Sequence, residues 1–325
     1  MPQRPALRDT LEYWMARAVV ETLARTPLAV AHRLARVYAG MLDLALPRLR
    51  RVAMANLAMA LPGLGESEHR RITAGVFHSI ARLLVAFARF PQINRTNVGE
   101  WIRYEGFEHF ENARERGYGV LFATAHLGNW ELSAFAHALM TAPLDVVIRP
   151  LDNPKIDALV ERYRGLSGNR LIGKKEYARV ILKALHDNEA VGILVDQNAS
   201  LEEGVFVDFF GVPACAGSGF AKLAAHSGAA VIPGFALWQA DERKYVLRFY
   251  PAIEVTGDIV HDTQALQSRL EAVIREYPDQ WLWIHRRWKT RPPGEKRIRP
   301  QMNTDEPSWT AGGRHTRDDE NVVDG

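Results

Sequence analysis

Short apolar runs alternate with segments of helical periodicity between about residue 100 and residue 290. This alternation constrains the fold more than any other feature of the chain. Apolar runs of strand length occupy 119–125, 145–149 and 190–197. Apolar residues at helical spacing occupy 130–140, 155–166, 176–187 and 219–228. Such alternation is typical of an α/β fold, in which helices flank a central sheet.

The next part of the chain predicts antiparallel pairing within the same sheet. Two apolar runs, 230–238 and 244–251, are joined by the polar turn "QADER". Two strands connected by so short a turn form a hairpin. A helix is predicted over 262–277, with Asp262 as its N-cap. The predicted fold is therefore α/β with a mixed central sheet flanked by helices.

The first 95 residues have helical periodicity and no strand pattern. One interpretation makes these helices part of a soluble core. The other makes them a membrane-association region, with Trp14 and Tyr38 at the lipid interface and Arg48, Arg50 and Arg51 facing anionic headgroups. No run of about 18 apolar residues lacks a charge, so a clean spanning helix is not predicted.

These patterns divide the chain into three parts. We predict an N-terminal helical, membrane-associating region over 1–95 and an α/β domain over 96–291. The segment 292–325 is polar and rich in Gly, Pro and charge, so we predict that it is disordered. The formal net charge of +3 and a pI near 9.0 fit an anionic partner, such as a membrane surface, phosphate or nucleic acid.

The stretch "LFATAHLGNWEL" contains the strongest candidate for chemistry. His126 directly follows an apolar strand, and Glu131 lies in the first turn of the next helix. Ligands bind beyond the carboxyl ends of strands in open α/β sheets. A carboxylate that holds one ring nitrogen leaves the other free to act as a general base. A structural His beside a helix-capping Glu is the alternative. No second His or Cys stands at zinc-ligand spacing, so no metal site is predicted.

"HLGNWE" resembles the motif of the lipid acyltransferases, and its Gly-Asn-Trp form resembles the bacterial lipid A biosynthesis acyltransferases. The resemblance extends from about residue 35 to residue 290. Further blocks that carry it, in the family's order, are "VIRPLDNPKID", "VGILVDQN", "GVFVDFFGVPA", "AVIPGF" and "YPDQWLWIHRRWK".

The resemblance implies that a fatty acyl group passes from an acyl thioester, carried by acyl carrier protein, to a hydroxyl of a glycolipid. The expected acceptor is a lipid A precursor, and the expected location is the cytoplasmic face of the inner membrane. No cofactor is expected. His126 would be the general base and Glu131 would orient it. The residues expected to contact substrate are Arg149, Asn129, Asp196, Gln197, Phe209, Phe210, Gly211, Arg286 and Arg287.

The residues leave other interpretations open. The acceptor could be a phosphoinositide mannoside or a lysophospholipid, and the donor could be coenzyme A. A non-catalytic lipid-binding protein could keep the same fold. Nucleic-acid binding is not predicted, because no recognition motif is present. Cys215 lacks a nearby base in the sequence, which argues against a cysteine nucleophile.

Overall fold

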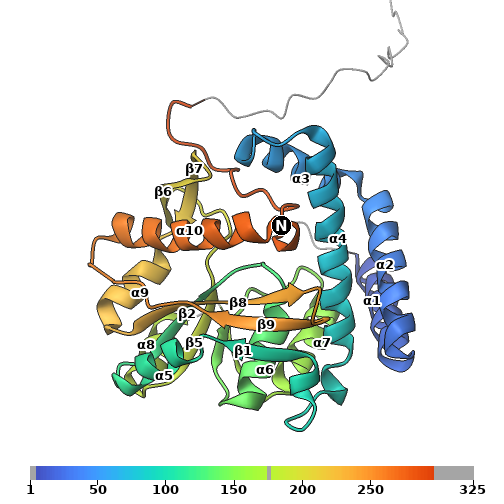
Figure 1. The fold of residues 1–325 in the computed structure, drawn as a ribbon, viewed down its shortest axis with the longest axis horizontal. Helices are drawn as coiled ribbons and strands as arrows, with labels where there is room; N and C mark the ends of the chain where they lie inside the picture. The colour runs from blue at the N-terminus through green and yellow to red at the C-terminus, as the bar shows by residue number, and fades with distance from the viewer. Residues whose placement is uncertain (1–4, 174–176, 296–325) are drawn as a thin grey trace, which may run out of the picture. The chain divides into compact units, whose positions relative to one another are not determined.

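A seven-stranded mixed sheet forms the centre of the protein in this computed structural model, which describes residues 5–173 and 177–295 (Figure 1). The strand order is β1-β9-β8-β2-β5-β3-β4. The strands are β1 (Ile102–Glu105), β2 (Val120–Thr124), β3 (Asp145–Val147), β4 (Arg170–Ile172), β5 (Ala190–Leu194), β8 (Ala230–Gln239) and β9 (Lys244–Phe249). All neighbouring strands run parallel except the β8–β9 hairpin, so the predicted mixed sheet is confirmed.

Helices cover both faces of the sheet, because β2 is apolar on both sides. Phe122 faces a core that also contains Phe110 and Phe135, from α5 and α6. Leu121 and Ala123 face a second core, beneath α8, α9 and α10. The helices of this part of the chain are α5 (Glu108–Glu115), α6 (Trp130–Met140), α7 (Pro154–Gly165), α8 (Tyr177–His186), α9 (Gly219–Ser227) and α10 (Ile259–Glu276).

Four helices precede the sheet. They are α1 (Ala6–Arg25), α2 (Leu28–Ala45), α3 (Pro47–Ala60) and α4 (Glu66–Ala88). Figure 1 shows α1, α2 and α4 standing side by side along one end of the sheet. One apolar core contains residues of α3 and α4 together with Leu127, Phe235 and Trp281. The predicted boundary near residue 95 therefore marks a change of architecture between parts that share a core.

Of the described helices, α4 alone is long and apolar enough to cross a membrane, and 61% of its most apolar stretch is buried inside the protein. Unlike α4, the helices α1 and α2 leave many large apolar side chains exposed to solvent. Their exposed large apolar side chains are Leu7, Leu11, Trp14, Met15, Leu28, Val30, Val37, Met41, Leu42 and Leu44.

Two features of the fold differ from the sequence-based expectation. The N-cap of α10 is Asp258, whose side chain accepts from the N–H groups of Val260 and His261. Asp262 is instead buried in the first turn, where it accepts from Thr256 and Gly257. A small hairpin of β6 (Gly204–Phe209) and β7 (Val212–Gly217) also stands apart from the main sheet.

Of the predicted disordered tail, 292–325, all but the first four residues lie outside the described residues.

Candidate active site

His126 lies just beyond the carboxyl end of β2, in a sharply bent loop that leads into α6. Gly128 makes this bend, with a φ of 65°. A Cβ at this position would lie 1.9 Å from the carbonyl oxygen of Ala236, so no other residue fits. Asn129 caps α6 by accepting from the N–H of Leu132 at 3.0 Å. The loop is therefore held by β8 on one side and by its own helix on the other.

Asp196 holds His126 at two atoms. It lies just beyond the end of β5, the parallel neighbour of β2, and is fully buried. Its Oδ2 accepts from the backbone N–H of His126 at 3.0 Å, and its Oδ1 lies 2.9 Å from Nδ1 of the ring. The indole N–H of Trp281 donates to Oδ2 at 2.9 Å. Because a carboxylate only accepts, Nδ1 carries the hydrogen and Nε2 keeps its lone pair.

His126 and Asp196 each stabilise the charged form of the other. Burial by itself would lower the pKa of His126, but the charge of Asp196 and its hydrogen bond outweigh burial and raise that pKa. Burial by itself would raise the pKa of Asp196, but the His126 ring, with His285 nearby and the Trp281 N–H, holds that pKa well below its usual range. Asp196 is therefore ionised at neutral pH, and the imidazolium form of His126 is stabilised.

Glu131 does not bond to the His126 ring, contrary to the expectation. Its two oxygens accept from Nε and an NH2 group of Arg164 at 2.8 and 2.5 Å. Oε1 also accepts from the indole N–H of Trp130 at 3.2 Å. The Trp130 ring in turn packs edge-on against His126, with ring centroids 4.9 Å apart. Glu131 thus acts on His126 by its charge, which raises the pKa of the ring, and through Trp130.

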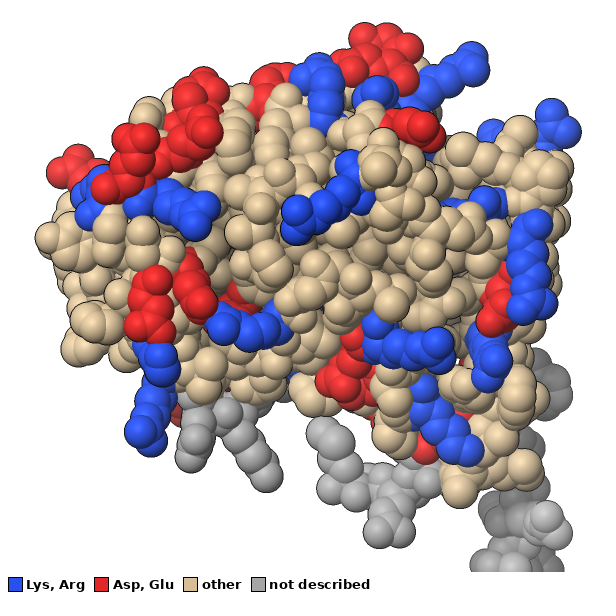
Figure 2. Space-filling view, turned by 90° about the horizontal axis from the view of Figure 1, so that it is seen from below, with Lys and Arg blue, Asp and Glu red and all other residues tan. Residues whose placement is uncertain are grey.

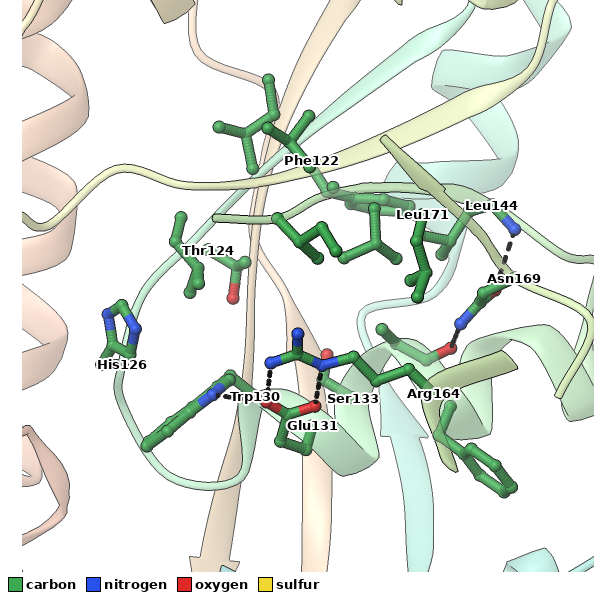
Figure 3. Close-up of a pocket in the computed structure, with 18 of the residues that line it drawn as sticks. Phe122, Thr124, His126, Trp130, Glu131, Ser133, Leu144, Arg164, Asn169 and Leu171 are labelled. Carbon is green, nitrogen blue, oxygen red and sulfur yellow. Dashed lines mark hydrogen bonds and ion pairs between the residues drawn. The ribbon is translucent and has the colours of Figure 1, made fainter. Parts of the chain in front are cut away.

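A cavity of about 530 Å³ begins at His126 and extends between the sheet and α6. Figure 3 shows His126 at one end and Leu144 with Asn169 at the other. The Glu131–Arg164 ion pair lies along one side between these ends. The walls are mainly apolar, and they include Phe122, Phe135, Val146, Leu171, Leu194, Leu247 and Phe249. The cavity can therefore hold an apolar chain whose reactive end lies beside His126.

Two of the predicted substrate contacts line this cavity near His126. Arg149 follows β3 and is exposed, as is Gln197, which directly follows Asp196. Since β3, β5 and β2 are parallel, their carboxyl ends bring Arg149, Gln197 and His126 to one edge of the sheet. This part of the expected site is assembled in the structure.

The other predicted contacts lie elsewhere. Phe209, Phe210 and Gly211 belong to the tip of the β6–β7 hairpin, where Phe209 and Phe210 pack against Trp281 and Trp283. Asn129 is fully buried and serves as the helix cap. None of these residues lines the cavity. The rings of Phe209 and Phe210 belong to the hydrophobic core, and the side chain of Asn129 makes the capping bond.

The two basic residues near the C-terminal end of the domain also differ from expectation. Arg287 is fully buried; it donates to the carbonyl of Cys215 at 2.8 Å and to Gln267 at 3.1 Å. Burial lowers its pKa to about 10. Arg287 therefore braces the interior, whereas Arg286 is exposed and does not line the cavity.

Cys215 is a structural residue of β7. It is buried, and burial raises the pKa of its thiol, so the reactive thiolate is suppressed. The thiol does not line the cavity beside His126. Within residues 5–173 and 177–295, no three His, Cys, Asp or Glu side chains gather as a metal site would require.

Two residues of the site carried no interpretable signal of their own in the sequence. Arg164 lies in the last turn of an ordinary polar helix, more than thirty residues from its partner Glu131. Trp281 belongs to a block that resembles the family, but nothing in its sequence neighbourhood pairs it with Asp196. Both contacts are long-range and exist only once the sheet has formed.

Comparison with known proteins gives consistent results. A family model described as bacterial lipid A biosynthesis acyltransferase matches residues 1–290. The lipid A biosynthesis lauroyltransferase of Escherichia coli K12 is 29% identical over 287 residues, which cover 86% of this chain and 92% of that protein. The lipid A biosynthesis palmitoleoyltransferase of the same strain is 30% identical over 257 residues, which cover 78% of this chain and 83% of that protein. A phosphatidylinositol mannoside acyltransferase of Mycolicibacterium smegmatis is 28% identical over 226 residues, which cover 68% of this chain and 73% of that protein.

Proposed function

Because the chain belongs to the bacterial lipid A biosynthesis acyltransferase family, we propose that it transfers a fatty acyl group from an acyl thioester to a hydroxyl of a lipid A precursor. The observation that carries this proposal is the buried Asp196 bonded to His126 at the mouth of an apolar cavity. A cavity of this kind suits an acyl chain, and a His fixed at one nitrogen suits removal of a hydroxyl proton.

The proposed reaction has two proton transfers. Nε2 of His126 removes the proton of the acceptor hydroxyl as its oxygen attacks the thioester carbonyl. The tetrahedral intermediate then collapses, the C–S bond breaks, and the imidazolium returns the proton to the leaving sulfur. Asp196 keeps Nδ1 protonated throughout and stabilises the imidazolium. A thioester is already an activated acyl group, so these residues suffice for the proton chemistry.

Glu131 and Arg164 have a supporting role in this proposal. Their ion pair is largely buried, with 11% and 20% of the side chains exposed. It fixes Trp130 against His126 and places a guanidinium beside the cavity. A positive charge at this position favours the oxyanion that develops on the thioester carbonyl.

Arg149 is our candidate for the acceptor headgroup, and acyl carrier protein is our candidate donor. Arg149 is exposed at the His126 end of the cavity, where a guanidinium can bind a phosphate with two hydrogen bonds. The donor thioester must reach His126 from the same opening, since the cavity extends inward from there. Parallel assays with acyl carrier protein and coenzyme A thioesters separate the two donors.

We also propose that α1 and α2 lie on the cytoplasmic face of the inner membrane. Leu7 and Leu44 have 82% and 84% of their surface exposed, and the exposed apolar residues around them are concentrated on these two helices. Large exposed apolar patches on a protein often mark membrane or protein interaction sites. Arg48 and Arg51 are exposed next to Leu44, where anionic headgroups would attract them.

The charge distribution does not favour nucleic acid as the partner. Figure 2 shows Lys and Arg interspersed with Asp and Glu on the face that it presents. A nucleic-acid backbone is instead bound along a continuous basic surface. On this face, the alternating charges offer no such surface.

Lipid mass spectrometry of a deletion strain tests the proposed function. We expect the lipid A fraction to lose one acyl chain, and the wild-type gene but not a His126→Ala variant to restore it. Restoration by His126→Ala would favour a non-catalytic lipid-binding role. Loss of an acyl chain from an inositol mannoside or a phospholipid, with lipid A unchanged, would assign a different acceptor, as the name of the mycobacterial relative would suggest.

A further inference from the structure

The cavity beside His126 ends at a second histidine. His137 lies two helical turns after Trp130 on α6, so the cavity follows this helix for about 10 Å. Phe122, Leu144 and Phe249 line the cavity near this end, together with the ring of His137. This end of the cavity is thus lined by side chains from α6, from β2 and β9, and from the residue that precedes β3.

His137 is held rigidly in this position. Its surface is 2% exposed, and its ring packs edge-on against Phe110 and Phe122 with centroids 5.0 and 5.3 Å apart. Nδ1 lies 3.2 Å from the hydroxyl of Tyr104, which also contacts Thr141 at 3.1 Å. Burial lowers the pKa of His137 to about 4, so the ring is neutral at pH 7 and compatible with an apolar neighbour.

A second cavity, of about 380 Å³, lies behind this ring. Among the described residues, His137 is the one that lines both cavities. The second cavity is lined by apolar residues, which include Phe110, Val120 and Ala190, and by charged residues, which include Arg114, Arg170 and Glu189. The imidazole ring of His137 therefore lies between the cavity beside His126 and this second cavity.

We propose that the ring of His137 is the end wall of the acyl cavity and sets the longest acyl chain that the enzyme transfers. This inference rests on the proposed acyl transfer and adds the residue that selects the donor. Because the protein interior is closely packed, an end wall fixed by Tyr104 and by two aromatic rings cannot move aside for further methylenes. Removing the ring joins the two cavities and makes room for them.

Gly192 allows a substitution with the opposite effect. It lies on β5 and lines the first cavity. A Cβ at this position would meet Leu144 Cδ1 at 3.5 Å, an ordinary contact, so alanine fits without strain. The added methyl group would occupy cavity volume before the end wall and would shorten the space for the chain.

The experiment measures kcat/KM of the full-length protein in detergent micelles with saturated acyl carrier protein thioesters from decanoyl to stearoyl and a lipid A precursor. We expect His137→Ala to raise the ratio of kcat/KM for longer over shorter donors by about tenfold or more, since pocket fit to one methylene is worth about that much. Gly192→Ala should lower the same ratio. His137→Phe restores a ring of similar size, and we expect it to keep the wild-type length limit.

The outcomes separate this inference from the proposed function. A wild-type protein that transfers no acyl group from any donor contradicts the proposed function itself. A His137→Ala protein that transfers acyl groups with the wild-type length profile overturns the inference alone, as does a His137→Phe protein that accepts long donors as well as His137→Ala does. If His137→Ala does not fold, Gly192→Ala decides the question, and an unchanged profile there overturns the inference.

Discussion

At the scale of single residues, His126 is the side chain whose surroundings fix it most completely. Its backbone N–H and its ring are bonded to the same carboxylate, and Trp281 holds that carboxylate in turn. A ring bonded to Asp196 at Nδ1 and packed against Trp130 presents Nε2 in one direction. Proton transfer depends steeply on such positioning, so the arrangement favours catalysis before any substrate is bound.

Arg149 offers the sharpest residue-scale test of how the acceptor is bound. If its guanidinium binds a phosphate in ground and transition states alike, Arg149→Lys should mainly raise KM for the acceptor, because the bidentate contact is lost and the charge remains. Steady-state kinetics with a phosphorylated acceptor and its dephosphorylated analogue measure this. An equal fall in kcat for both acceptors, with KM unchanged, would assign Arg149 to the oxyanion instead.

The position of His126 was predicted correctly from the sequence, whereas the hydrogen-bond partner of its ring was predicted incorrectly. His126 was expected just beyond the end of a predicted strand, and the structure confirms that placement. Asp196 was expected to contact substrate, but it bonds to His126 instead. Glu131 was expected to bond to the ring because it is close in sequence. It bonds to Arg164 instead, since the first turn of α6 directs it toward α7. A local motif such as His-x4-Glu does not show that an arginine 33 residues away will bind the Glu131 carboxylate.

At the scale of elements, hydrophobic periodicity predicted the long helices and the central strands well. The helix predicted over 130–140 matches α6, and the predicted hairpin matches β8 and β9. The short edge strands β1 and β4 were missed, because their sequences, IRYE and RLI, contain too few apolar residues to form a recognisable apolar run. The N-cap of α10 was misassigned because Asp258 and Asp262 are equally good cap residues, and only the structure shows which one meets free N–H groups.

The exposed apolar face of α1 and α2 makes an element-scale prediction. We expect a double substitution, Met41→Glu with Leu44→Glu, to weaken binding to anionic vesicles by more than about tenfold, since each apolar side chain withdrawn from lipid costs about 1.5 kcal/mol or more. Vesicle co-sedimentation measures the loss. Val260→Glu, an exposed apolar position on α10, is the matched control and should bind like the wild type. Undiminished binding of the double variant would contradict the membrane role of this face.

At the scale of the whole molecule, the site depends on segments that are far apart in the chain. The C-terminal segment meets the His126 loop through a bridge between Leu127 and Trp281 and through a bond from Leu282 N–H to the carbonyl of His126. The same segment shares a core with α3 and α4. The geometry of the His126 loop therefore depends on the packing of α3 and α4, of the sheet and of this C-terminal segment.

The pH dependence of kcat/KM tests most directly whether Asp196 governs the base. A general base must be neutral, so activity should rise with pH through the pKa of His126. Asp196 raises that pKa, and its removal in Asp196→Asn should move the rise to lower pH and reduce the plateau by about 100- to 10,000-fold. Glu131→Gln, which keeps the Asp196 bond, should shift the rise less. A shift confined to Glu131→Gln, with the Asp196→Asn profile unchanged, would contradict this account.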